Sequence, residues 1–239
     1  MNHPAANASF ANEQTFRPVI RPTVPILTVI DDGSIDDGEQ IRIRKDCFVI
    51  GRSSGDLTIP NDATMSSRHA EIRLTNSRGL REWTLHNLES VNGTFVRVGT
   101  AALAYDTIVL LGSRRFRLEK PAAVASELPG SDTLRIDQPA DSGKNWPMLV
   151  ESSGRPNALR FPLRSPKVTI GRTGSGCDLQ LDDPLVAAFH AELVADASGG
   201  WKLIGKITRN GVWVNTPATT LTSYCFFQCG EQRFKFVIP

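Results

Sequence analysis

The chain of 239 residues carries one sequence phrase twice, and this internal repeat restricts its possible folds more than any other feature. The stretch MSSRHAEI at 65–72 returns as VAAFHAEL at 186–193, about 120 positions later. Other pairs recur at a similar distance: Gly51-Arg52 with Gly171-Arg172, and Asn92-Gly93 with Asn210-Gly211. A chain of this length has room for two domains of about 100–120 residues. The repeat therefore predicts two copies of one fold in tandem.

Each copy consists of short segments in which apolar and polar residues alternate, separated by Gly, Asn, Asp or Pro. A period of two in segments rich in Val, Ile, Thr and Phe is typical of antiparallel strands, and no segment has a convincing helical period. The predicted fold is all-β: two tandem antiparallel β-sandwiches joined by a flexible linker. Composition marks 121–145 as that linker and 1–23 as a disordered tail, which leaves domains at 24–120 and 146–239.

Charge and hydropathy argue against several classes of protein. The formal net charge is +2, which is too small to predict binding to nucleic acid or to a membrane surface. The N-terminal residues lack the pattern of a secretion signal, and no apolar run approaches the ~18 residues of a membrane span. A reducing, cytoplasmic location is the expectation.

The four cysteines are too few for a disulfide framework in a chain of this length. Cys225 and Cys229 are close in sequence, and two interpretations stay open for them: half of a zinc site, or thiols of a buried strand. No second Cys or His pair has finger-like spacing, which favours buried thiols. Neither a metal nor a cofactor is expected.

Polar residues of the first copy gather where predicted strands begin or end. Arg52 follows the segment CFVIG, Ser66 and Ser67 precede AEIRL, and Asn92 precedes TFVRV. Loops at one end of a sandwich can present such side chains together. A guanidinium matches phosphate or carboxylate, a hydroxyl donates to an anionic oxygen, and an amide can hold a peptide backbone. These residues predict an oxyanion pocket beside a peptide clamp.

Three blocks of the first copy resemble the signature of the forkhead-associated (FHA) domain, in the usual order and spacing. They are Gly51-Arg52, Ser66 to Ala70, and NLESVNGTFV at 87–96. The resemblance implies an eleven-stranded β-sandwich that binds phosphothreonine peptides through its apical loops. It further implies that Arg52 and Ser66 hold the phosphate, that Ser67 assists, and that Asn92 holds the peptide backbone.

The resemblance also gives roles to three structural residues. His69 would brace the loop, while Gly51 and Gly93 would permit tight turns. One residue departs from the family pattern: Val91 stands where a polar residue often precedes Asn-Gly, so one possible polar contact with a peptide is missing.

The second copy retains the arginine, the histidine and the asparagine but has lost the serines, which are replaced by Ala187 and Ala188. A hydrogen bond to a charged group is worth about 1.5–3 kcal/mol, so weak or absent phosphopeptide binding is expected there. Arg172, Arg209 and Asn210 remain candidate binding residues of this degenerate copy.

Other functions are less compatible with the sequence. Ser66 and His69 could be a hydrolase pair, but no orienting acid or oxyanion hole accompanies them, so no enzyme is predicted. Arg114, Arg115 and Arg117 are expected on a solvated strand edge. The alternative to a phosphothreonine adaptor is an assembly subunit whose two sandwiches bind partners independently of phosphate.

The expected partners are phosphothreonine-containing proteins, either kinase substrates or a Ser/Thr kinase. Self-recognition is a further hypothesis, since Thr133 stands three residues before Ile136 and a residue at that distance often guides FHA domains. Thr15 in the tail is a weaker candidate for the same role.

Overall fold

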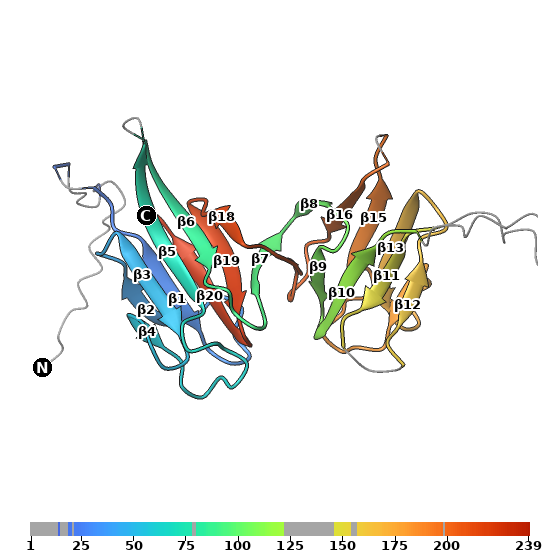
Figure 1. The fold of residues 1–239 in the computed structure, drawn as a ribbon, viewed down its shortest axis with the longest axis horizontal. Helices are drawn as coiled ribbons and strands as arrows, with labels where there is room; N and C mark the ends of the chain where they lie inside the picture. The colour runs from blue at the N-terminus through green and yellow to red at the C-terminus, as the bar shows by residue number, and fades with distance from the viewer. Residues whose placement is uncertain are drawn as a thin grey trace, which may run out of the picture.

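The structure is a computed structural model that describes residues 14, 19–20, 22–77, 80–121, 146–153, 157–197 and 199–239. All regular structure in these ranges is β-strand, which confirms the predicted all-β fold (Figure 1). The described ranges contain no helix long and apolar enough to cross a membrane. Most of the expected tail and linker, with Thr15 and Thr133, lies outside the described residues.

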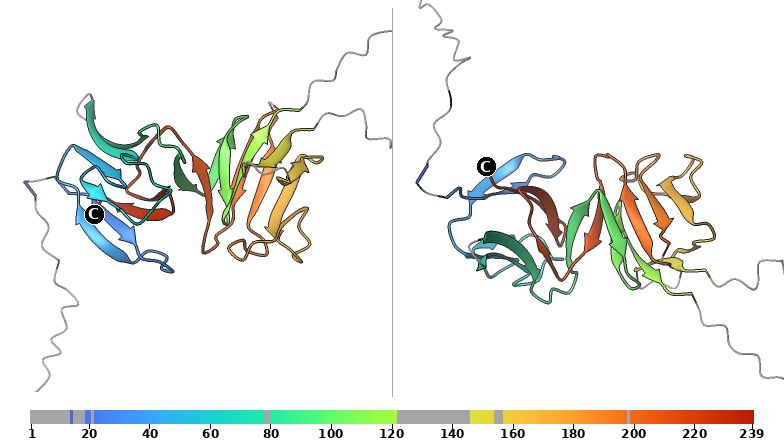
Figure 2. Two further views of the ribbon diagram at one scale, coloured as in Figure 1. Left: turned by 60° about the horizontal axis from the view of Figure 1, so that its bottom comes forward. Right: turned by 90° about the horizontal axis from the view of Figure 1, so that it is seen from above.

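The strands form two lobes, which lie side by side along the long axis of the molecule (Figures 1 and 2). The first lobe contains β1 (Ile26–Ile30), β2 (Gly38–Arg42), β3 (Cys47–Gly51), β4 (Leu57–Thr58), β5 (Ala70–Ser77), β6 (Leu80–Asn87), β7 (Thr94–Val98), β18 (Ala218–Thr220), β19 (Tyr224–Cys229) and β20 (Gln232–Val237). The second lobe contains β8 (Thr100–Leu103), β9 (Ile108–Leu111), β10 (Arg114–Glu119), β11 (Met148–Glu151), β12 (Arg160–Pro162), β13 (Lys167–Arg172), β14 (Leu179–Leu181), β15 (Ala191–Ala195), β16 (Trp201–Gly205) and β17 (Val212–Asn215).

Three sheets build the two lobes. A five-stranded sheet of order β18-β6-β5-β3-β4 belongs to the first lobe, and one of order β14-β13-β15-β16-β8 belongs to the second. A ten-stranded sheet of order β12-β11-β10-β9-β17-β7-β19-β20-β1-β2 runs through both. Each half of this long sheet packs against one short sheet, so each lobe is a sandwich.

The two repeats exchange their last three strands. Strands β8, β9 and β10 come from the first repeat but pack in the second lobe, where Leu103 and Phe116 share a core with Leu193 and Leu203. Strands β18, β19 and β20 come from the second repeat and return to the core of the first lobe. In Figure 1 the red C-terminal strands accordingly lie among the blue and cyan ones.

This exchange corrects the expectation that 24–120 and 146–239 each fold as a separate sandwich. The two stretches are the sequence repeats, but the packed units are 100–215 on one side and 22–98 with 216–239 on the other. Because the repeats are similar, the last three strands of either copy can fill the same place in a sandwich. The chain passes from the first lobe to the second at the single residue Gly99, between β7 and β8. It returns at Thr216-Pro217, between β17 and β18.

The junction between the lobes has its own contacts. Strand β7 pairs antiparallel with β17, from Val98 opposite Val212 to Phe95 opposite Asn215. On one face of this pairing, a small cluster of buried residues forms a third core: Ile30, Phe95, Leu110, Trp213 and Phe226. The junction therefore combines strand pairing with apolar burial, both of which depend on the exchange.

The cysteines occupy different environments. Cys229 is buried in β19, and burial raises the pKa of its thiol; burial also raises the pKa of Cys225 to about 11. Cys47 is exposed. Among the described residues, no group of three or more His, Cys, Asp or Glu side chains could hold a metal ion.

Candidate functional site

The candidate site of the first copy lies on three loops that leave the ends of β3, β5 and β6. Gly51 ends β3, and a Cβ atom there would lie 2.0 Å from the carbonyl oxygen of Ser67, so the close approach of the loops requires glycine. The backbone N–H of Arg52 donates to the carbonyl of Ser66 at 2.9 Å. The two loops are thus joined at the residues predicted to bind phosphate.

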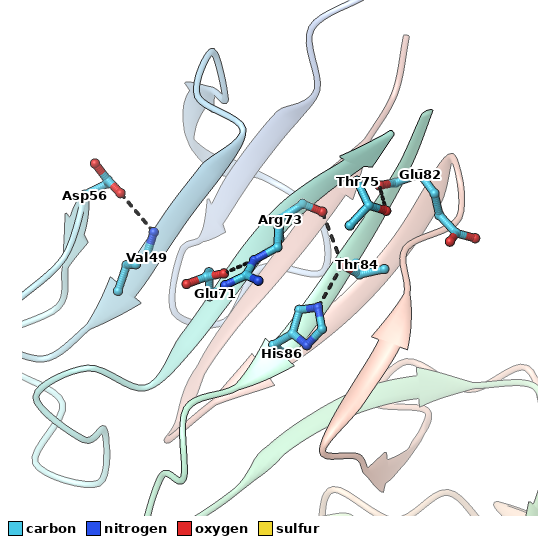
Figure 3. Close-up of polar contacts among 8 residues, drawn as sticks. All are labelled: Val49, Asp56, Glu71, Arg73, Thr75, Glu82, Thr84 and His86. Carbon is cyan, nitrogen blue, oxygen red and sulfur yellow. Dashed lines mark hydrogen bonds and ion pairs between the residues drawn. The ribbon is translucent and has the colours of Figure 1, made fainter. Parts of the chain in front are cut away.

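The carboxylate of Asp56 holds the loop that carries Arg52 against β3. Asp56 accepts a hydrogen bond from the backbone N–H of Val49 at 2.9 Å (Figure 3). It also forms an ion pair with Lys45. The side-chain hydrogen bond from Lys45, with the Val49 N–H, lowers the pKa of Asp56. Figure 3 also shows contacts on the face of this sheet: Arg73 with Glu71 along β5 at 2.6 Å, and the Thr84 hydroxyl donating across the strands to the carbonyl of Arg73 at 3.3 Å. The contacts of Asp56 connect β3 with the loop that follows Arg52.

Arg52 and Ser66 retain the groups needed to bind an anion. The guanidinium of Arg52 is exposed, and its one hydrogen bond within the described residues goes to the carbonyl of Ala63 at 3.5 Å. The hydroxyl of Ser66 accepts from the backbone N–H of Val91 at 3.1 Å, which leaves its own hydrogen to donate elsewhere. Ser67 is exposed and shares a hydrogen bond with Ser53 at 2.7 Å.

His69 is buried and braces the loop from inside. Its Nδ1 accepts from the backbone N–H of Ser66 at 3.0 Å, so the proton is on Nε2, which donates to the carbonyl of Gly93 at 3.1 Å. Burial lowers the pKa of His69. The neutral imidazole therefore ties the Ser66 loop to the Asn92-Gly93 turn, and the Ser66–His69 pair does not have the geometry of an activated nucleophile.

Asn92 is held by contacts at both ends of its amide group. Its Nδ2 donates to the carbonyl of Thr64 at 2.7 Å, and its Oδ1 accepts from the guanidinium of Arg115 at 3.2 Å. Gly93 has a φ of 73°, and a Cβ there would lie 2.2 Å from Nδ2 of Asn215 in the other repeat. The Asn-Gly turn is therefore positioned by residues of the second lobe.

Sequence reasoning missed the role of Arg115 and misplaced it on a solvated edge. Arg115 is half-buried, lies over the ring of Phe95 at 5.2 Å, and reaches across to Asn92. Its neighbours differ from it: Arg114 pairs with Glu151 at 3.1 Å and Arg117 with Glu119 at 2.6 Å. Alternation along β10 places Arg115 and Arg117 on the same face, opposite the buried Phe116 and Leu118, so it could not have separated them. The contact of Arg115 with Asn92 depends on tertiary structure.

Asp62 is a second residue that sequence reasoning missed. It accepts from the backbone N–H of Thr64 and from those of Glu231 and Gln232, which belong to the exchanged strand pair. Burial alone would raise the pKa of Asp62, but these hydrogen bonds outweigh it and the pKa is lowered. The ionised carboxylate of Asp62 therefore attaches the loop that carries Ser66 to the C-terminal strand pair β19–β20.

The second copy repeats the backbone frame without the hydroxyls. The N–H of Arg172 donates to the carbonyl of Ala187 at 3.0 Å, and the N–H of Ala187 donates to Nδ1 of His190 at 3.1 Å. Nδ2 of Asn210 donates to the carbonyl of Leu185 at 2.9 Å. Arg209 does not join this frame, because its guanidinium donates to the carbonyl of Gly33 in the first lobe at 3.0 Å.

Apolar residues stand on the loops of the second copy where the first copy has polar ones. Leu185, Phe189 and Ile207 are exposed, whereas the repeat places Thr64, Arg68 and Glu89 at the matching positions. The ring of Phe189 lies 4.7 Å from Nζ of Lys206. The two copies thus present different chemistry from the same loops.

Comparison with solved structures found partial matches. Two yeast Pml1 chains, one described as a full-length crystal structure and the other as a splicing factor integrated into the RES complex, are each 26% identical with a TM-score of 0.29. The matches cover 31% of this chain and 58% and 56% of those chains, less than two thirds of either.

A third solved chain, from a study of phosphothreonine-dependent FHA domain interactions, is 32% identical with a TM-score of 0.26. That match covers 39% of this chain and 92% of the other. The comparison with curated proteins returned no match. The model of the FHA domain matches residues 48–112 and 168–223, about half of the chain, so the chain belongs to the FHA domain family and carries two copies in tandem.

Proposed function

We propose that this protein is a phosphothreonine-dependent adaptor whose first FHA copy holds the phosphopeptide. FHA domains are in general non-catalytic modules that bind phosphothreonine in partner proteins. The observation that carries the assignment to the first copy is the Ser66 hydroxyl, which accepts from Val91 and keeps its hydrogen for another acceptor beside the exposed Arg52. A phosphate oxygen is the acceptor that this pair fits best.

The remaining candidate residues have complementary roles in this proposal. Ser67 would supply a second hydroxyl to the phosphate, and Asn92 would contact the peptide backbone after its amide is released from, or shared with, Thr64 and Arg115. His69, neutral and fully buried, would keep the Ser66 hydroxyl in place without itself contacting the peptide.

A second candidate function applies to the second copy, which would bind an unphosphorylated partner. The exposed Leu185, Phe189 and Ile207 favour it, because apolar side chains on the loops disfavour a charged ligand and favour an apolar one. The full chain would then join a phosphorylated partner to an unphosphorylated one. In this proposal Ala187 and Ala188 mark the change of ligand.

The test titrates the full chain with an oriented phosphothreonine peptide library and with the same library carrying threonine, read by fluorescence anisotropy. Arg52→Ala and Ser66→Ala are expected to weaken binding by about ten- to a hundredfold each, the worth of one hydrogen bond to a charged group. Arg172→Ala, the matching change in the second copy, is the control and should leave affinity within about twofold of the wild type, an energy difference smaller than RT. Equal binding of both libraries would refute the phosphothreonine proposal.

A further inference from the structure

A cleft of about 650 Å³ lies at the junction of the two lobes, and neither Ser66 nor Ser67 lines it. Its walls come from both repeats: the hairpin residues 30–35, the loop residues 184–185 and the turn 230–233. Leu110, Trp213 and Phe226 of the junction core also line it. A cleft of this size is in the range of ligand sites.

Four arginines line this cleft: Arg97, Arg115, Arg209 and Arg233. Their hydrogen bonds go to neutral oxygens, namely the carbonyl of Thr208, Oδ1 of Asn92, the carbonyl of Gly33 and Oε1 of Gln228 respectively. Within the described part of the chain, none of the four has a carboxylate oxygen within the 4.0 Å of an ion pair. Four permanent cations therefore face the cleft without a paired anion.

Two of these cations are close to each other and partly buried. Arg233 lies over the ring of Trp213 at 4.9 Å and Arg97 over the ring of Phe226 at 5.5 Å. Burial, and then the positive charge of Arg97, lower the pKa of Arg233, so the two charges repel each other. Contact with aromatic rings offsets part of this cost, and a bound anion would offset more. The carboxylates of Asp31, Asp32 and Glu231 also line the cleft but are exposed and lie outside ion-pair distance.

The cleft is continuous with the candidate phosphothreonine loop. Arg115, in its wall, donates to Asn92, and Asn92 donates to the carbonyl of Thr64, which also lines the cleft. The next residue back along the chain, Ala63, accepts from the guanidinium of Arg52. Because adjacent Cα atoms are about 3.8 Å apart, a peptide that lies on Arg52 and Asn92 reaches the edge of the cleft within a few residues.

We infer that the junction cleft is a second phosphate-binding site, which receives a second phosphorylated residue of the peptide whose phosphothreonine lies at Arg52 and Ser66. Arg97 and Arg233 bind this second phosphate, since guanidinium groups match its oxygens and these two are partly buried. The inference rests on the proposed function of the first copy. The site exists because the repeats exchange strands, which brings Arg97 of β7 and Arg233 of β20 to one sheet.

The experiment uses the full chain and two peptide sets: one with a single phosphothreonine, and one with an added phosphoserine at each position up to six residues on either side. The wild type is expected to bind at least one doubly phosphorylated peptide about ten- to a hundredfold more tightly than the single one. Arg97→Gln/Arg233→Gln is expected to remove this gain and leave binding of the single phosphopeptide unchanged. Arg42→Gln/Arg81→Gln, two exposed arginines on β2 and β6, is the control with the same change of charge.

The outcomes separate the inference from the proposed function. If single-phosphopeptide binding depends on Arg52 but no second phosphate adds affinity, or if the gain persists in Arg97→Gln/Arg233→Gln, the second site is refuted and the proposed function stands. If no peptide binds through phosphate, inorganic pyrophosphate is titrated by calorimetry. If pyrophosphate binds the wild type and Arg97→Gln/Arg233→Gln abolishes this binding, the result supports an anion site in the cleft without the peptide. If pyrophosphate does not bind the wild type, the anion site is refuted.

A variant that fails to unfold cooperatively on heating would be replaced by Arg97→Lys and Arg233→Lys. These changes keep the charge and lose the two-pronged contact of the guanidinium with phosphate. Each is expected to lose part of the gain from the second phosphate. Full retention of the gain in both lysine variants would contradict the inference.

Discussion

At the scale of single residues, the two copies differ by a few atoms in the same frame. Ser66 and Ala187 both donate their N–H to the Nδ1 of a buried histidine, and both accept at their carbonyl from the N–H of the preceding arginine, Arg52 or Arg172. At this position the first copy has the Ser66 hydroxyl, which accepts from the N–H of Val91 and keeps its own hydrogen to donate to another acceptor. At this position the two copies therefore differ in side chains rather than in backbone geometry.

This difference predicts that a serine restores phosphate binding in the second copy. Ala187→Ser, made in an Arg52→Ala background to silence the first copy, is expected to raise affinity for phosphothreonine peptides about ten- to a hundredfold. Fluorescence anisotropy with the phosphorylated and unphosphorylated libraries measures the change. The matched control is Ala188→Ser. No gain from Ala187→Ser would mean that Leu185 and Phe189 exclude a charged peptide.

The two buried histidines predict how stability depends on pH. Burial lowers the pKa of both His69 and His190, so the unfolded chain takes up protons first as the pH falls below the ordinary value of about 6.5. The contribution of these histidines to the free energy of unfolding is complete above that pH. It declines below that pH, by at most about 1.4 kcal/mol per histidine per pH unit. Urea unfolding at pH 7.5 and 5.5 measures the decline. His69→Gln and His190→Gln should each reduce the loss of unfolding free energy between the two pH values. An unchanged loss in both variants would contradict the lowered pKa of these histidines.

At the scale of elements, two short connections decide which strands pair. Gly99 alone separates β7 from β8, too few residues for a tight hairpin between them, so β8 continues away and pairs with β16. Thr216 and Pro217 separate β17 from β18, which pairs with β6. Proline has no N–H for a ladder and fixes φ, which suits a crossing segment. Both connections therefore favour exchange.

Disulfide trapping tests this pairing directly. Thr84 lies opposite Thr220, while Ala102, which the repeat makes the counterpart of Thr220, lies opposite Lys202. Thr84→Cys/Thr220→Cys is expected to form a disulfide under mild oxidation, and Thr84→Cys/Ala102→Cys is expected not to. Peptide mapping by mass spectrometry without reduction identifies the bond, with the exposed Cys47 replaced by serine. A bond in the second variant alone would show that the repeats fold separately.

At the scale of the whole molecule, the exchange makes one lobe continuous in sequence and divides the other. Every buried residue of the second core lies between Leu103 and Val212. The first core instead combines residues 27–85 with 221–236. The two lobes then share the β7–β17 pairing and the junction core, which bind them into one long sheet. The cleft with Arg97 and Arg233 is a property of this assembly.

Fragments of the chain are expected to fold on their own when their ends match a lobe, and not when their ends match a sequence repeat. Residues 100–215 are expected to unfold cooperatively on heating when expressed alone, because they contain all strands and core residues of the second lobe. Residues 22–99 are expected to fold when 216–239 are added in trans, and to remain unfolded without them. Circular dichroism and thermal unfolding measure both. A folded 24–120 beside an unfolded 100–215 would contradict the exchange.

The sequence predicted much of the local structure and much of the candidate site. Alternation predicted the strands, and the spacing of Arg52, Ser66 and Asn92 from strand ends predicted that they lie on neighbouring loops. It missed Arg115 and Asp62, because their partners Asn92 and Glu231 are distant along the chain and a single sequence carries no record of such contacts. It also could not assign the last three strands to a lobe, because the two repeats are alike.

The sequence by itself determined that there are two FHA copies, that each is built from short strands, and that one lacks the serines of the other. These properties depend on local composition and on periodicity, which involve only residues that are close together in the sequence. The tertiary structure decided which copy completes which sandwich, and hence that Arg97, Arg115, Arg209 and Arg233 meet in one cleft. The physical reason is that strand order follows from the connections at Gly99 and Pro217, whereas either copy could supply an equivalent core.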